Sequence, residues 1–204
     1  MTSILKADTI QDTDGNNIIN ENSNTITIGA SGDTTNIIGT LQNNGAAVGG
    51  LTMADQWRLT ANISQPSGDI TTNLERVDDA SYGTLGTGMT ESSGVFSFPS
   101  TGIYLVLVSA CINYANQNDN KSEIRTIVTI NNSSYDEVSS AVAGSNSNSN
   151  NSMFTVFSQT LIDVTDTSNV KVKFNADSFQ TSVSLIGNTD QSFTSFSFIR
   201  LGDT

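Results

Sequence analysis

The amino-acid sequence predicts an all-β protein in which a short N-terminal arm precedes a larger β-domain. Asparagine, serine and threonine make up 77 of the 204 residues. These side chains compete with the helical backbone for hydrogen bonds, and threonine also suits strands. Short runs of valine, isoleucine and phenylalanine alternate with clusters of glycine and asparagine, as in strands joined by turns. Residues 1–50 contain no aromatic residue and no proline, so the chain changes character near Gly50.

The segment 1–50 lacks the large side chains from which a hydrophobic core is built. It has to be disordered, lie on a partner or wind around copies of itself, because it buries too little apolar surface to offset the ordering of its backbone. Isoleucine and leucine recur in short runs at 25–29, 32–39 and 41–45, each ended by glycine or Asn-Gly. This rhythm predicts short strands whose neighbours come from other chains, followed by a hinge at 46–50. The residues expected to anchor this arm are Ile4, Leu5, Ile10, Ile18 and Ile19.

An acidic segment within the arm admits two interpretations. Asp12, Asp14 and Asn16 alternate as the first ligands of a helix-loop-helix calcium site do. That site also needs glycine at its sixth position and glutamate at its twelfth, where this chain has Asn17 and Ser23. A tight turn through Asp-Gly is therefore favoured.

Beyond the hinge, the chain reads as a run of strands that predicts a β-sandwich or jelly roll. The predicted strands are residues 51–64, 69–77, 94–98, 102–114, 122–131, 135–142, 153–163, 169–177, 181–186 and 192–201. Turn clusters separate them, including Gln117–Asn120. The longest cluster, Gly144–Asn151, consists of glycine, serine and asparagine alone, which favours a mobile loop over a ligand-facing one.

One predicted strand is apolar on both of its faces. Alternate side chains of a strand point to opposite sides, so one side carries Ile103, Leu105 and Leu107 and the other carries Tyr104, Val106 and Val108. A strand in a monomeric antiparallel sandwich has one polar face. One face of this strand therefore fills the core, and the other requires a cover. The last strand, which begins near Phe193, repeats the pattern more weakly, and the two together predict a subunit interface.

Three stretches resemble the globular head of complement, the C1q-like branch of the tumour necrosis factor jelly rolls. They are Gly94–Tyr104, with its Gly-x-Phe, proline and Gly-x-Tyr, then Leu161–Val172, and Phe193–Phe198, where Ser195 replaces the family's usual glycine. Such jelly rolls form tight trimers, and the likeness covers about residues 76–201. It implies a trimer interface at Ile103, Leu105, Leu107 and Phe193. It also implies a core that contains Phe96, Tyr104, Val106, Phe196 and Phe198.

The opening Ile4–Ile19 and the short-strand segment 25–45 resemble the start of phage virion proteins, in which three chains intertwine. An arm joined to a trimeric knob implies a protein of the virion surface that is assembled in the host cytoplasm. A capsid decoration protein would hold the major capsid protein through residues 1–50. A short tail fibre would hold a tail adaptor and present its knob to a host glycan or protein. The short shaft favours decoration. A secreted lectin-like module comes third, because no apolar signal-peptide core is expected at the N-terminus.

Composition argues against several other classes. A net charge of −12, with only eight lysine and arginine residues, does not suit a phosphate-binding surface, so no nucleic-acid partner is expected. No stretch of about 18 apolar residues predicts a membrane span. The single cysteine, Cys111, lies in an apolar run, where a small buried side chain is favoured over a reactive thiol.

Catalytic chemistry is also not expected, and neither is a cofactor or a metal. The chain has no histidine, the commonest general base and zinc ligand. Paired carboxylates remain as candidates for glycan hydrolysis. Neighbours on a strand point to opposite faces, so Asp78–Asp79 and Asp136–Glu137 are not expected to converge, and Asp163 with Asp166 is typical of a turn.

Overall fold

The computed structural model describes residues 9–11, 13, 17–22, 25–28, 31–38, 41–43, 46–47, 50–146 and 149–204. Every regular element in these ranges is a strand, which confirms the all-β prediction. The chain divides into two compact units, Met1–Gly50 and Leu51–Thr204, called the arm and the knob below. Within the described ranges there is no helix of the length and hydropathy needed to span a membrane.

The arm contains two small antiparallel sheets. The first is a meander of β1 (Thr9–Gln11), β2 (Asn17–Asn22) and β3 (Thr25–Ile28), and the second pairs β4 (Gln42–Asn43) with β5 (Ala46–Ala47). The register places Ile10, Ile19 and Ile28 opposite one another across three strands. The meander therefore concentrates isoleucine in one row.

Strands β1 to β3 pair with one another within the single chain, because a hairpin needs only a short loop. Pairing with strands of other chains stays a prediction. One expectation for the arm was wrong. The described part of the predicted strand 32–39 has no strand, and Ile38 is 96% exposed there. The predicted hinge contains β5. The loop between β1 and β2, where a turn was favoured over a calcium site, lies outside the described residues except for Thr13.

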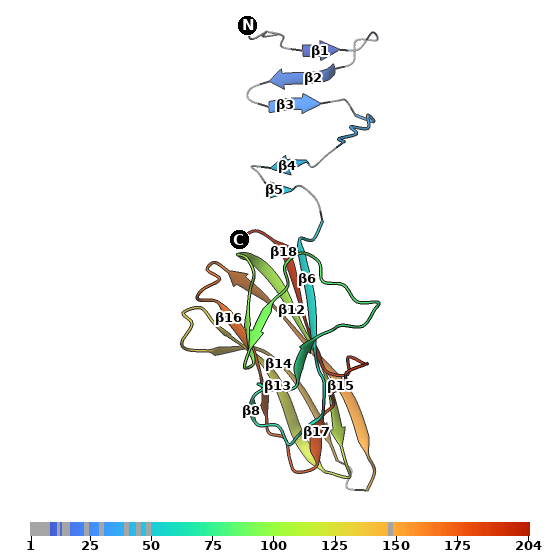
Figure 1. The fold of residues 1–204 in the computed structure, drawn as a ribbon, viewed down its shortest axis with the longest axis vertical. Coiled ribbons are helices and arrows are strands. Elements are labelled where there is room, and N and C mark those ends of the chain that lie inside the picture. Colours follow the sequence, from blue (N-terminus) through green and yellow to red (C-terminus); the bar gives the residue numbers. More distant parts are fainter. Residues whose placement is uncertain are drawn as a thin grey trace. The chain divides into compact units, whose positions relative to one another are not determined.

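The knob consists of two antiparallel sheets that face each other (Figure 1). The six-stranded sheet contains β10 (Thr90–Ser92), β11 (Val95–Ser97), β16 (Lys171–Asp177), β13 (Asp119–Thr129) and β14 (Asp136–Ser145), with β8 (Gly68–Asp69) beside β16. The seven-stranded sheet contains β7 (Ile63–Ser64), β17 (Val183–Leu185), β12 (Gly102–Tyr114), β18 (Ser195–Gly202), β6 (Met53–Leu59) and β9 (Leu74–Arg76), with β15 (Ser152–Val164) beside β12.

The core fills the space between the two sheets. Phe96 and Phe174 come from the six-stranded sheet, and Phe196 and Phe198 come from the seven-stranded one. The rings of Phe174 and Phe196 stack with centroids 3.9 Å apart, and Phe96 lies 5.2 Å from Phe198. Aromatic side chains bury a large apolar area each, so this cluster fixes the two sheets face to face.

Several predicted strands match the observed ones closely, and others differ from them. Strand β12 has the predicted bounds. The predicted strand 69–77 is two strands, because β8 pairs with β16 in one sheet while β9 pairs with β6 in the other. Strand β10 was missed, and β14 continues to Ser145, so two residues of the presumed loop Gly144–Asn151 belong to a strand.

Candidate self-association surface

Strand β12 divides its side chains between the core and the outer face of the seven-stranded sheet. Tyr104 and Val106 point inward and are buried, whereas Leu105 and Leu107 point outward and are partly exposed. Ile103 lies on the same outer side and is also partly exposed. Within the single chain, one face of β12 is therefore covered by the core, and the other face is open to solvent.

Strand β15 adds a more exposed apolar stripe to this face. Its register with β12 places Leu161 opposite Leu105, Phe157 opposite Ser109 and Met153 opposite Asn113. The stripe consists of these three β15 side chains, whose exposed fractions are Met153 54%, Phe157 73% and Leu161 62%. Sequence reasoning missed the stripe, because its apolar residues recur only at every fourth position, with Thr155 and Gln159 between them on the same face.

A hollow lies beside the stripe on the same face. Its volume is about 480 Å³, and it is lined by Gln56, Leu107, Val108, Ser109, Phe157, Ser158, Gln159, Ser195 and Ser197. The Gln56 amide donates a hydrogen bond to the Ser197 hydroxyl at 3.1 Å, which fixes one wall. Phe157 therefore belongs both to the stripe and to the lining of the hollow, whereas Met153 and Leu161 belong to the stripe alone.

The outer face of the six-stranded sheet has a different character. Arg125 lies among three carboxylates there, with its guanidinium nitrogens 2.8 Å from Glu123, 2.7 Å from Asp177 and 3.3 Å from Glu137. The hydrogen bond from Arg125 holds the pKa of Glu123 at about 2, well below its ordinary value. Lys173 lies over the Tyr135 ring at 4.1 Å. This face presents ion pairs to solvent, whereas the opposite sheet presents apolar side chains.

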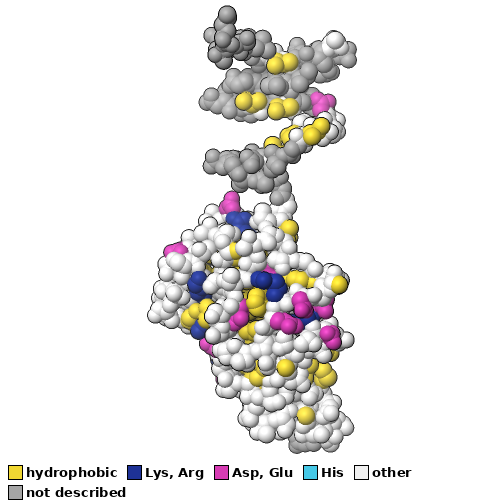
Figure 2. Space-filling model, in the orientation of Figure 1, with side chains coloured by type: hydrophobic (Ala, Val, Ile, Leu, Met, Phe, Trp, Pro, Cys, Tyr) yellow, Lys and Arg dark blue, Asp and Glu magenta, His cyan; other side chains and the backbone are white. Residues whose placement is uncertain are grey.

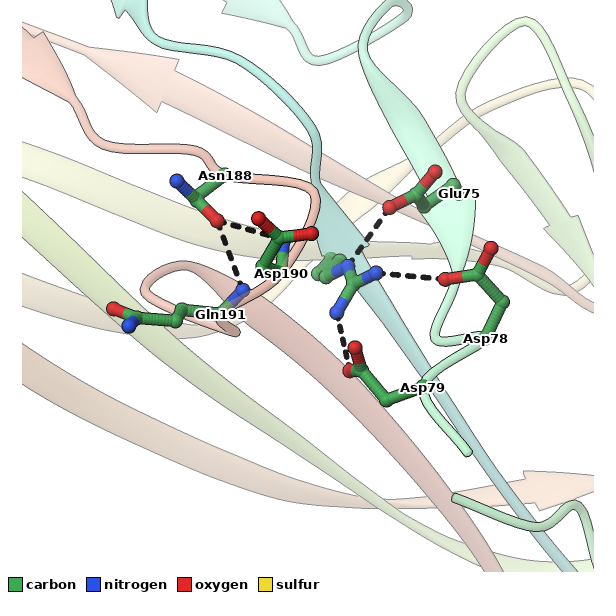
Figure 3. A network of polar contacts seen from close by, with 7 residues as sticks. Glu75, Asp78, Asp79, Asn188, Asp190 and Gln191 are labelled. Carbon is green, nitrogen blue, oxygen red and sulfur yellow. Dashed lines mark hydrogen bonds and ion pairs between the residues drawn. The ribbon is translucent and has the colours of Figure 1, made fainter. Parts of the chain in front are cut away.

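A buried arginine closes the border of the seven-stranded sheet. Arg58 on β6 is fully buried, and its guanidinium meets Glu75 at 2.8 Å, Asp78 at 2.8 Å and Asp79 at 2.6 Å. Figure 3 shows the three carboxylates directed at this one group, next to the turn formed by Asn188, Asp190 and Gln191. The expectation that Asp78 and Asp79 would not converge was wrong, because both lie in the loop after β9, where strand alternation does not apply.

A second buried ion pair lies on the core side of the same strand. Asp55 is 4% exposed and accepts hydrogen bonds from Arg76 at 2.9 Å, Tyr82 at 3.0 Å, Trp57 at 3.0 Å and the backbone N–H of Met89 at 2.8 Å. Such a set of donors satisfies the carboxylate without water. Burial raises the pKa of the Tyr82 hydroxyl, so this group stays a neutral donor. The role of Asp55 is structural.

The other candidate carboxylates are also committed to structure. Glu137 belongs to the Arg125 network, and Asp136 is exposed beside it. Asp166 accepts hydrogen bonds from Ser168 and Asn169 in the turn after β15, and these bonds lower its pKa. Asp163 lies on β15 opposite Ile103. Among the residues that the structure describes, no three acidic or cysteine side chains gather as a metal site would require.

The structure places the residues singled out from the sequence as follows. Phe96, Tyr104, Val106, Phe196 and Phe198 are all buried in the core. Phe193 is 36% exposed in the loop just before β18 rather than within the strand. Cys111 is buried and free. In the arm, Ile10 is exposed, and Ile18 and Ile19 belong to strand β2. Ile4 and Leu5 lie outside the described residues.

Comparison with known proteins identifies the fold of the knob. The structure of the Eiger TNF from S. frugiperda matches with a TM-score of 0.56 and 14% identity, over 76% of this chain and 95% of that one. Murine APRIL at pH 5.0 matches with a TM-score of 0.50 and 12% identity, over 73% and 98%. The knob is a TNF-like jelly roll. No family model and no curated protein sequence matches the chain.

The TNF-like jelly roll supports, at the level of the fold, the family resemblance from which the trimer was predicted. At 12–14% identity the likeness does not extend to ligands or partners. What the TNF-like knob can do is decided by its own surfaces. Of those described, the outer face of the seven-stranded sheet is the one that combines a raised apolar stripe with a hollow.

Proposed function

We propose that this chain is a non-enzymatic structural protein of a virion surface. In this proposal it forms a homotrimer through the jelly-roll knob, and residues 1–50 fix the trimer to the major capsid protein as a decoration protein. The observation that carries the proposal is the apolar outer face of the seven-stranded sheet. Side chains as exposed as Phe157 and Leu161, aligned on one strand, mark an interaction site in a water-exposed protein.

The shape of this face favours a ring of like subunits. The stripe continues past the hollow to Met153 and Leu161, so the stripe of one copy would fit the hollow of the next in a head-to-tail contact. Such contacts close into rings when the rotation between copies permits it. The TNF-like fold supports three copies in the ring. The six-stranded sheet, with the ion pairs around Arg125, would then face solvent.

The arm supports an anchoring role because it exposes isoleucine without covering it. Ile26 is 66% exposed, and Ile10 and Ile28 are also exposed on the three-stranded meander. A sheet this small has no second layer to bury one face, and isolated sheets of this size are marginal in water. A partner surface, or the arms of the other two copies, would cover these side chains. In this proposal, the partner surface is the capsid shell.

A second candidate is a short tail fibre whose arm holds a tail adaptor and whose knob binds the host surface. The observation that favours it is a hollow of amide and hydroxyl side chains at one end of the knob, described in the next section. The two candidates share the trimer and the anchor. They differ in whether the copies lie on the capsid or on the tail. They also differ in whether particles without the protein lose heat stability or lose adsorption to cells.

Gold-labelled antibody against the knob, applied to intact particles, tests the location directly. Label spread over the capsid supports decoration, and label confined to the tail overturns it. Particles that lack the protein provide the second readout. We expect them to release their genome at a lower temperature and to adsorb to cells at the normal rate, because bound trimers add binding free energy to the assembled shell. Loss of adsorption with unchanged heat stability would reverse the assignment.

A further inference from the structure

Three loops far apart in the sequence meet at the end of the knob opposite its first residue. Strand β6 begins beside the last residues of β18, level with the start of β12. Strand β12 then runs through thirteen residues to Tyr114, about 40 Å away for an extended chain. The loops 115–118 and 178–182 and the end of β14 lie at that far end, where Ala115 donates a backbone hydrogen bond to Ser182.

We propose that a hollow at this end binds a neutral saccharide. The distal hollow, as we call it, has a volume of about 270 Å³ and is lined by Asn118, Asp119, Asn120, Lys121, Ser178 and Gln180. It unites the Gln117–Asn120 turn with the 178–182 loop. The inference concerns the knob alone and is independent of whether the protein decorates a capsid or a tail.

The distal hollow is held in shape by the buried carboxylate of Asp119. Its oxygens accept hydrogen bonds from the backbone N–H of Lys121 at 3.0 Å, the Ser122 hydroxyl at 2.7 Å and the backbone N–H of Gln180 at 3.2 Å. The loop from β16 is thereby tied to the turn before β13. A side chain at Gly144 would lie 2.6 Å from the Asn120 carbonyl, so only glycine allows β14 to pass this closely. The walls are therefore preformed.

The backbone around the distal hollow is strained. Asn116, Ser178 and Ser182 have φ angles of 55°, 64° and 70°, a region that costs free energy for residues with a side chain. Strain of this kind persists where the surrounding structure holds it, and it is concentrated at binding sites. Three of the seven non-glycine residues with positive φ in the part of the chain that the structure describes lie in these two adjoining loops.

A buried hydroxyl lies behind Asp119. Tyr114 is fully buried, and no described group lies in good hydrogen-bond geometry to its hydroxyl, although the Ser122 side chain is close enough to interact with it. Burial raises the pKa of this hydroxyl, the interaction with Ser122 lowers it, and the Asp119 carboxylate raises it further. The group is thus a neutral donor held next to the floor of the distal hollow. A water or ligand hydroxyl that reaches past Asp119 would satisfy it.

The side chains that line the distal hollow select for hydroxyl groups. Each carboxamide of Asn118, Asn120 and Gln180 offers donors and an acceptor together, which matches a hydroxyl that donates and accepts at once. Adjacent ring hydroxyls of a sugar can use two such amides. The Asp119 carboxylate already accepts three hydrogen bonds, so it is not available to a cation.

Charge argues against an acidic ligand. The Lys121 ammonium is paired with Glu123 at 2.6 Å, and the whole chain carries a net charge of −12. That field repels anions at a distance. Figure 2 shows acidic and basic side chains over the middle of the face in view and neither kind over the described surface toward the end that bears β17. A neutral saccharide fits these surroundings better than a sialylated one.

Fluorescent full-length protein on an array that carries matched neutral and sialylated glycans tests the proposal. We expect binding to a subset of the neutral glycans, since trimers on a surface gain from multivalency. Gln180→Ala removes the carboxamide but keeps the backbone bond to Asp119, and it should weaken binding about tenfold, as the loss of one or two neutral hydrogen bonds does. Asn118→Ala should act in the same direction.

The matched control is Gln191→Ala. Gln191 is another exposed glutamine whose backbone N–H is bound by a side-chain oxygen, that of Asn188, away from the distal hollow. Its binding should equal that of the wild type, and circular dichroism and light scattering should show all three variants folded and assembled. Absence of binding to every neutral glycan, a preference for sialylated ones, or equal binding by Gln180→Ala and the wild type would overturn the proposal.

Discussion

At the scale of single residues, several acidic side chains of the knob are held by arginine. Asp55, Asp79 and Glu123 each lie against an arginine within hydrogen-bond distance. Pairs of this kind are costly to break, because the remaining partner stays buried and uncompensated. Two predictions follow the same reasoning in different parts of the knob.

Asp55→Ala removes the acceptor of four hydrogen-bond donors. We expect the free energy of unfolding to fall by about 1–3 kcal/mol, because the Trp57 indole and the Met89 N–H lose their shared acceptor, whereas the partly exposed Arg76 guanidinium can turn to water. Urea unfolding at a fixed protein concentration measures the change. Asp190→Ala, at an exposed position, is the control, with an expected change within about 0.5 kcal/mol. An equal effect of the two substitutions would contradict the structural role of Asp55.

Glu123 makes stability depend on pH in the acid range. Its pKa in the folded knob is about 2 against an ordinary 4.5, so the carboxylate stabilises the fold above pH 4.5 and loses that contribution as the pH falls toward 2. Glu123→Gln should therefore cost on the order of 3 kcal/mol at pH 7, and the difference from the wild type should shrink between pH 5 and pH 2. Unfolding curves across this range, with Asp136→Asn as the exposed control, provide the test. A difference independent of pH would refute the assignment.

At the scale of elements, the two sheets have opposite outer faces. Strand β15 pairs with β12 alone among the described strands, so it forms one edge of its sheet and carries the stripe there. Strand β14 forms an edge of the other sheet and exposes only Val138 and Val142 among its larger apolar side chains. Isolated exposed valines are ordinary on a protein surface. Three large apolar side chains exposed in line on one strand, with a hollow beside them, are not.

Phe157→Asp or Leu107→Asp should abolish self-association. Either change places like charges without partners in a contact that excludes water, which is strongly unfavourable. Light scattering of the wild type should give three times 21.6 kDa, and the variants should give the monomer mass. Val142→Asp is the matched control, because Val142 is 49% exposed on the outer face of the other sheet, and it should remain a trimer.

A mixture of Leu161→Asp and Leu107→Asp chains tests the head-to-tail geometry. Leu161 does not line the hollow, so Leu161→Asp keeps an intact hollow, and Leu107→Asp keeps an intact stripe. Each mixed pair therefore retains one complete contact but cannot close a ring. Sedimentation of the mixture should therefore show dimers that neither variant forms alone. A mixture that remains monomeric would favour stripe-to-stripe contacts, and a monomeric wild type at micromolar concentration would refute the interface altogether.

At the scale of the whole molecule, the proposed function assigns assembly to the knob and anchoring to the arm. The knob has its own aromatic core, whereas the sequence of residues 1–50 contains no aromatic residue. A chain that lacks residues 1–50 should fold, keep the trimer mass and lose particle binding, as measured by co-sedimentation with particles stripped of the protein. The full-length chain is the positive control. A truncated knob that binds particles as well as the full chain does would assign the anchor to the knob instead.

The sequence by itself determined the fold class, the change in character near Gly50 and most strands of the knob. Local physics was sufficient for these features, because alternation along one strand reports which side chains share a face. Strand β12 was predicted to the residue for this reason, and so was its separation into Tyr104 and Val106 on one side and Leu105 and Leu107 on the other.

Only the tertiary structure decided which distant surfaces lie together. Strand alternation gave no means to see that Asp78 and Asp79 meet Arg58, since the loop that carries them folds back over β6. The stripe at Phe157 and the distal hollow around Asp119 depend in the same way on register between strands far apart in the chain. Pairing of this kind is set by packing and loop closure over the whole knob, so it cannot be read from one segment at a time.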